Sequence, residues 1–150
     1  MDALAKLETW AAPKRTKWMG ILRIALGTFI VYKGIIFTID INSLQAITSR
    51  MDILFASVGL AHYVIAAHII GGSMLAFGIF TRGASLIQIP ILIGAVIFVN
   101  FDKGFLSVGN HMELEVSIIV LALLIFFFIF GGGKWSLDEL RRKDIIMHKT

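Results

Sequence analysis

The 150-residue sequence contains no cysteine, only two prolines and a small share of charged residues. Without cysteine, the chain forms no disulfides, thiol redox relays, cysteine-ligated zinc sites or iron–sulfur clusters. Charged residues make up 16% of the chain and hydrophobic residues 57%, and the mean hydropathy is +0.85. Soluble domains carry about 25% charge. The composition therefore excludes an ordinary soluble domain and indicates one membrane-embedded domain spanning residues 1–150.

The net charge of +4 does not indicate a nucleic-acid partner. The basic residues stand at the ends of apolar runs, which is the distribution that membrane topology produces. No interleaving of aromatic and basic residues of the kind that binds single strands is present. The lipid bilayer is the expected partner, and nucleic acid is not.

The stretch Leu60–Gly83 organises the rest of the chain. About 20 apolar residues at 1.5 Å each cross roughly 30 Å of hydrocarbon. This stretch nevertheless carries His62, His68 and Arg82, which lipid cannot solvate. Small residues allow a neighbouring helix to approach closely, and here they are Gly71, Gly72, Ser73, Ala76 and Gly78. We therefore expect this helix to form the inner wall of a bundle, with His68 facing inward.

Four membrane spans are predicted, at about residues 19–38, 60–81, 84–101 and 113–130, with a short turn around Arg82-Gly83. In the first span, Gly20, Gly27 and Gly34 recur every seven residues and form one packing seam. In the third, Pro90 predicts a kink, and Gln88 is expected to satisfy freed backbone groups. The predicted fold class is an all-α, integral membrane four-helix bundle.

Interfacial helices are expected at both ends of the chain. Residues 1–17 are amphipathic up to Pro13, and Ser136 followed by Glu139 fits a capping box that opens a basic C-terminal helix. Arg50 and Lys103 fall on one side of the predicted spans. Ten basic residues fall on the other: Lys6, Lys14, Arg15, Lys17, Arg82, Lys134, Arg141, Arg142, Lys143 and Lys149. This asymmetry places both termini in the cytoplasm.

The ionisable residues of the outer half are the candidate ligand-binding or proton-relay residues: His68, Glu113, Lys33, Tyr63 and His62. Two interpretations compete. In one, His68 and Glu113 hold a small polar head group such as a quinone carbonyl and exchange protons with it. In the other, Lys33, His68 and Glu113 only hold the helices in register. For Lys33, snorkelling to the interface is a further alternative.

The inner half carries residues for which a structural role is expected: Arg23, Arg82 and Gln88. The helix-packing glycines are Gly27, Gly34, Gly71, Gly72 and Gly78. No metal site is expected, because no two histidines stand three or four residues apart. His62 and His68 are six residues apart and lie on different faces of a helix, which disfavours a haem. The sequence identifies no catalytic residue and leaves open whether the protein is an enzyme.

Several short motifs occur in the order typical of one family. R-x3-G-x6-G is met by Arg23, Gly27 and Gly34. G-G-x2-L-x2-G-x3-R is met by Gly71, Gly72, Leu75, Gly78 and Arg82. G-x-G-x-x-S-L-D is met by Gly131, Gly133, Ser136, Leu137 and Asp138. Over residues 18–138 the chain resembles the DoxX-like family of small bacterial membrane proteins. It departs from the family pattern at His68, where many members have glutamate, and at Phe37, where many have lysine.

The resemblance implies a multi-pass protein of the bacterial cytoplasmic membrane and an association with quinone-linked oxidoreductases or membrane redox complexes. The first functional hypothesis is a supporting subunit that binds quinone or lipid in the outer half of the bundle. The alternatives are a non-enzymatic scaffold or assembly chaperone and a small-solute or proton carrier. A membrane protein partner or a homodimer is expected in each case.

Overall fold

The computed structural model describes residues 10–42, 44–45, 57–100 and 112–147, without the side chains of residues 57, 98–100, 112–114 and 143–147. The described residues outside turns are helical. A short turn η1 (Ala12–Lys14) precedes the long helix α2 (Lys17–Ile39). The helices α4 (Ser57–Ala66) and α5 (Gly72–Phe77) are joined without interruption by a π-helical turn, η2 (Ala67–Gly71). Helix α6 (Thr81–Gly94) continues into a second π-helical turn, η3 (Ala95–Asn100), and is followed by α7 (Met112–Phe130) and α8 (Leu137–Met147).

The predicted spans agree with these helices to within a few residues, except at one turn. The sequence places the link between the second and third spans at Arg82-Gly83, and this is wrong. Helix α5 ends at Phe77, the following Gly78 adopts the left-handed conformation with φ +70°, and α6 already begins at Thr81. Arg82 and Gly83 therefore lie in the first turn of α6. The sequence also predicts a short surface helix from Asn42 or Ser43 to about Met51 and an outer loop at Phe101–Met112. Both lie largely outside the described residues.

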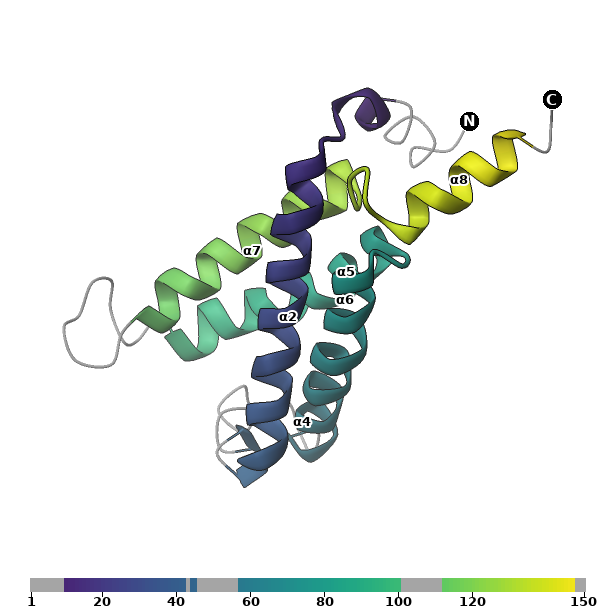
Figure 1. Ribbon diagram of the computed structural model, residues 1–150. Helices are drawn as coiled ribbons and strands as arrows, with labels where there is room; N and C mark the ends of the chain where they lie inside the picture. The colour runs from purple at the N-terminus through teal and green to yellow at the C-terminus, as the bar shows by residue number, and fades with distance from the viewer. Residues whose placement is uncertain (1–9, 43, 46–56, 101–111, 148–150) are drawn as a thin grey trace.

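The helices form two pairs. Helix α2 packs along α4, η2 and α5, and α6 packs along α7. Figure 1 shows the two pairs sharing one end and diverging from it. At this shared end lie η1, the α5–α6 turn and the start of α8. We call it the polar end, formed by Arg15, the turn Gly78–Phe80 and the segment Gly131–Glu139.

Two glycines of the α2 seam, Gly27 and Gly34, contact the helix formed by η2 and α5, whereas Gly20 lies against the Trp135 side chain. A Cβ at Gly27 would lie against the backbone nitrogen of Ala76 and 2.7 Å from the carbonyl oxygen of Gly72. A Cβ at Gly34 would lie 2.9 Å from the Cβ of His68. Backbone therefore meets backbone here, and only glycine leaves room for it.

Apolar side chains pack between the pairs near the polar end. Phe127 and Leu75 are fully buried, and Leu124 is nearly so. They belong to one cluster, whose other buried members are Met19, Leu26, Ile30, Ala84 and Val120. A smaller cluster lies toward the far end of α2 and α4, and it consists of Leu44, Ala61 and Val64.

Much of the helix surface is both apolar and exposed. Two helices, Lys17–Ile39 and Val58–Phe77, are long and apolar enough to cross a membrane, and two shorter apolar helices cover Thr81–Ile97 and Glu115–Phe130. Only 33% of the most apolar window of α2 is buried, and Ile21 on this helix is 61% exposed. A core helix of a soluble protein is mostly buried. The exposed apolar surface thus fits lipid contact.

Candidate functional site

The candidate site is built around His68, which lies in the π-helical turn η2 between the two straight parts of the second helix. Its side chain is buried, at 8% exposure, as the inward orientation predicted from the sequence requires. The Nδ1 atom lies 2.8 Å from the carbonyl oxygen of Val64. Because a carbonyl only accepts, Nδ1 carries the proton of this bond, and the second nitrogen, Nε2, is the one that gains or loses a proton.

Helix α2 supplies the wall next to His68. Gly34 permits the approach of the histidine Cβ, and the ring of Phe37 meets the imidazole edge to face at a centroid distance of 5.4 Å. Lys33, half-buried on the same helix, directly precedes Gly34. A buried imidazole is thus packed against an aromatic ring of α2.

The π-helical turn that carries His68 is stabilised from α6. The amide nitrogen Nε2 of Gln88 donates a hydrogen bond of 2.7 Å to the carbonyl oxygen of Ala67, the first residue of the turn. Gln88 is buried, and a Cβ at Gly71 would lie 3.0 Å from its amide. The sequence suggested that Gln88 satisfies backbone groups freed by Pro90. Instead, Gln88 bonds to a backbone carbonyl of the neighbouring helix. That helix has a π-helical turn at this point, and the wider turn changes the usual backbone hydrogen bonds of an α-helix.

Two other predicted members of the outer cluster, Tyr63 and His62, lie on the exposed surface. Tyr63 is 48% exposed, and His62 is exposed with its Nδ1 bonded to the carbonyl oxygen of Val58. The side chain of Glu113 lies outside the described residues, so the expected pairing with His68 or Lys33 stays a prediction. Within the described part of the chain, no three His, Asp or Glu side chains come together as a metal site would need.

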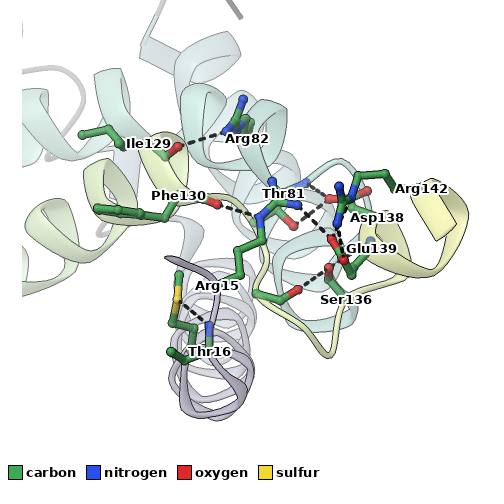
Figure 2. Close-up of polar contacts among 12 residues, drawn as sticks. Arg15, Thr16, Thr81, Arg82, Ile129, Phe130, Ser136, Asp138, Glu139 and Arg142 are labelled. Atoms are coloured by element: carbon green, nitrogen blue, oxygen red, sulfur yellow. Dashed lines mark hydrogen bonds and ion pairs between the residues drawn. The ribbon is translucent and has the colours of Figure 1, made fainter. Parts of the chain in front are cut away.

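At the polar end, Asp138 joins the start of α8 to the start of α6. Its carboxylate accepts hydrogen bonds from the backbone nitrogens of Phe80 (2.7 Å) and Thr81 (2.8 Å) and from the Thr81 hydroxyl (2.9 Å). Its own backbone nitrogen donates to the carbonyl oxygen of Gly78. Figure 2 shows the contact between Asp138 and Thr81 beside Arg15 and Glu139. A carboxylate at a helix N-terminus is favoured by the helix dipole, and here it comes from a distant segment.

An ion-pair network ties the N-terminal segment to α8. Arg15 donates to Glu139 at 2.9 Å and to the carbonyl oxygen of Phe130 at 3.1 Å (Figure 2). Arg142 also pairs with Glu139, at 2.6 Å. Burial alone would raise the pKa of Glu139, but the hydrogen bonds from Arg142 and Arg15 outweigh it, and the pKa lies below its ordinary value.

Two further arginines bind backbone carbonyls at the polar end, in keeping with the structural role expected for them. Arg82 donates to Ile129 at 3.0 Å, and the buried Arg23 donates to Trp135 at 2.9 Å. The Asp138 carboxylate attracts Arg23 electrostatically. The guanidinium of Arg23 occupies the space that a Cβ at Gly78 would need. Gly78 was expected to allow close packing of helices. In the structure it follows the last residue of α5 and leaves room for the guanidinium of Arg23.

The start of α8 forms part of the capping box that the sequence predicts. The backbone nitrogen of Glu139 donates to the hydroxyl of Ser136 at 3.1 Å, which is one half of the expected capping box. The Glu139 side chain turns to the two arginines instead of back to Ser136. Gly131 and Gly133 have φ values of +78° and +77°, which favour glycine. The connections made by Arg15, Thr81 and Asp138 were not predicted from the sequence. The S-L-D motif and the capping box pointed to that region but not to these partners.

The family comparison agrees with this architecture. The DoxX family model matches residues 19–101, more than half of the chain. The chain belongs to the DoxX family. The match covers α2 through η3, which includes Arg23, the glycine seam, the His68 turn and Arg82. No curated protein and no solved structure matches the chain.

Membership in the DoxX family and the exposed apolar helices together indicate a membrane protein. The family motif residues can now be placed. Arg23 and Gly78 meet at the polar end, and Gly27 and Gly72 form the contact between α2 and α5. Most motif positions therefore build the scaffold, and His68 stands apart from them as a buried titratable group.

Proposed function

We propose that this DoxX-family protein is a multi-pass subunit of the bacterial cytoplasmic membrane that supports a quinone-linked oxidoreductase by holding quinone beside His68. The observation that carries the proposal is a buried imidazole in a π-helical turn, with its ring against that of Phe37. π-helical turns inside α-helices occur frequently at functional sites. A fold does not define a function, so the argument depends on this group.

The chemistry of the side chains fits a quinone. A quinone is reduced by taking up electrons and protons at its two carbonyl oxygens. In its protonated form, His68 Nε2 donates a hydrogen bond to such an oxygen, and in its neutral form it accepts one from a quinol hydroxyl. Phe37 supplies an apolar ring next to the imidazole. Neither residue is redox-active, so the electrons belong to the partner enzyme.

We propose four membrane crossings with both termini in the cytoplasm. The continuous helix Thr81–Asn100 and the 19-residue helix α7 are each about 28–30 Å long at 1.5 Å per residue, which matches the hydrocarbon thickness. The start of α2 and the start of α8 lie at the same end of the helices (Figure 1), as an even number of crossings requires. The basic residues of the polar end favour the cytoplasmic side.

Quinone binding by the purified full-length protein tests the proposal. A short-chain ubiquinone is titrated into the protein in detergent, and bound and free quinone are separated and quantified. We expect His68→Gln to weaken binding about tenfold, the loss of a good hydrogen bond to a desolvated group. His62→Gln is the matched control, since His62 lies on the same helix but is exposed, and it should bind as the wild type does.

Equal binding by both variants would remove His68 from the site. If the wild type retains no quinone but co-purifies with a stoichiometric protein partner, and His68→Gln retains that partner too, the scaffold interpretation replaces this proposal. Glu113→Gln, measured alongside, shows whether the carboxylate expected at this depth contributes to binding.

A further inference from the structure

A cavity lies at the polar end, and His68 is not among the residues that line it. It has a volume of about 400 Å³ and opens between the start of α6, the end of α7 and the start of α8. This volume falls within the roughly 300–1,000 Å³ typical of small-molecule sites. Its lining includes Arg15, Arg82, Arg141, Asp138, Phe80 and Leu86.

The charge of the cavity is positive. Three arginines from three separate segments line it against one carboxylate, that of Asp138, which already bonds to the start of α6. Guanidinium groups bind phosphate oxygens in pairs and are favoured for this purpose over lysine. Arg141 is exposed, while Arg15 is nearly buried. Glu139 pairs with Arg15 at the base of the cavity, so the positive charge comes mainly from Arg82 and from Arg141 at the mouth.

One wall is apolar and continuous with the outer surface of α6. Phe80 is 64% exposed and Leu86 is 54% exposed, and both line the cavity. Phe80 has φ +49°, an unusual conformation for a residue other than glycine, and its ring occupies the space that a Cβ at Gly83 would need. Strained residues of this kind cluster at ligand sites. A ligand with a charged head and an apolar tail fits such a wall.

We propose that this cavity binds the phosphate of an anionic phospholipid, with the arginines holding the headgroup and the acyl chains following Leu86 along α6. The inference rests on the membrane embedding within the proposed function and does not depend on quinone binding. A free phosphate shares the headgroup chemistry, but it would leave the apolar wall uncovered. The site would anchor the start of α6 and α8 at the membrane surface.

Lipid retention measured by native mass spectrometry tests the site. The full-length protein in detergent is mixed with phosphatidylglycerol, with phosphatidylcholine, or with both. We expect selective retention of phosphatidylglycerol, weakened about tenfold or more in Arg141→Glu, because a charge-assisted contact is replaced by repulsion. The matched control is Lys134→Glu, which makes the same change of charge at an exposed residue of the same end outside the lining. It should retain phosphatidylglycerol.

Three results would overturn the proposal: equal retention in the two variants, equal retention of the two lipids by the wild type, or displacement of phosphatidylglycerol by inorganic phosphate at low millimolar concentration. The last would identify a soluble anion as the ligand. Quinone titration of Arg141→Glu separates the two sites, because its quinone affinity should equal that of the wild type whatever happens to the lipid.

Discussion

The polar end and the His68 turn differ in how their polar groups are bonded. At the polar end, residues more than 50 positions apart join through charged hydrogen bonds, as between Asp138 and Thr81 or Arg15 and Glu139. In the His68 turn, the described hydrogen bond of the histidine is to a carbonyl of its own helix. The turn receives one hydrogen bond from another helix, from the amide of Gln88 to the carbonyl oxygen of Ala67. We interpret the polar end as the region that fixes the helices relative to one another. We interpret the His68 turn as the region that positions a proton-exchanging side chain.

The largest expected effect tests whether the contacts of the polar end hold the helices together. Asp138→Ala removes three hydrogen bonds to a carboxylate and the charge that attracts Arg23, and we expect it to lower the unfolding free energy by about 3 kcal/mol or more. The measurement is equilibrium unfolding in mixed detergent micelles. Thr81→Ala should cost less, and the double variant should cost less than the sum, since the two side chains bond to each other. Additive losses would show that they act separately.

Replacing Gly27 tests the scaffold between the two regions. Gly27→Ala forces a methyl group onto the backbone of α5, and we expect a loss of about 2 kcal/mol in the same unfolding assay. Gly59→Ala is the control, because nothing lies within 4 Å of the added Cβ. That variant should be neutral or stabilising by up to about 1 kcal/mol, as expected from helix propensity. Equal losses at both positions would contradict the packing role of Gly27.

The support of the His68 turn is tested at Gln88. Gln88→Leu removes the hydrogen bond to the Ala67 carbonyl, and we expect a stability loss of about 1 kcal/mol. It should also weaken quinone binding, since the turn that holds His68 loses its cross-helix contact. Gln88→Met, of similar length and likewise without an amide, should behave in the same way. Unchanged quinone affinity in both variants would separate the turn from the site.

The smallest effect concerns pH at the polar end. Because the pKa of Glu139 is lowered from its ordinary 4.5, the stability that its ion pairs contribute is fully present above that value. It is lost as pH falls through the lowered pKa. Thermal unfolding between pH 7 and pH 3 should show less of this decline in Glu139→Gln than in the wild type. Identical pH profiles would mean that the Arg15 and Arg142 pairs add no stability.

The sequence allowed the all-helical class and the helix positions to be predicted, because span lengths and glycine spacing are local signals. Helix α2 at Lys17–Ile39 lies within two residues of its predicted bounds, and Gly27 and Gly34 form the expected contact. The turn at Gly78–Phe80 was misplaced for a physical reason. The group that fixes the start of α6 is Asp138, 57 residues beyond Thr81 in the chain, and no local pattern reports such a partner.

The candidate site was predicted in part. His68 is buried as its position in an apolar helix with small neighbours suggested, and Arg23 and Arg82 bind carbonyls at one end. The π-helical form of η2 has no signal in the sequence, since it depends on packing against α2 and α6. Similarly, the exposure of His62 and Tyr63 follows from the exact rotation of α4, which periodicity alone does not define.

One measurement tests whether the His68 turn binds quinone while the polar end has a structural role. It is hydrogen–deuterium exchange of the full-length protein with and without a saturating short-chain ubiquinone. The account predicts that quinone slows amide exchange in Val64–Gly72 and in the facing part of α2 around Gly34, and leaves Gly78–Thr81 and Ser136–Glu139 unchanged. Protection that appears at Gly78–Thr81 and not around His68 would contradict it.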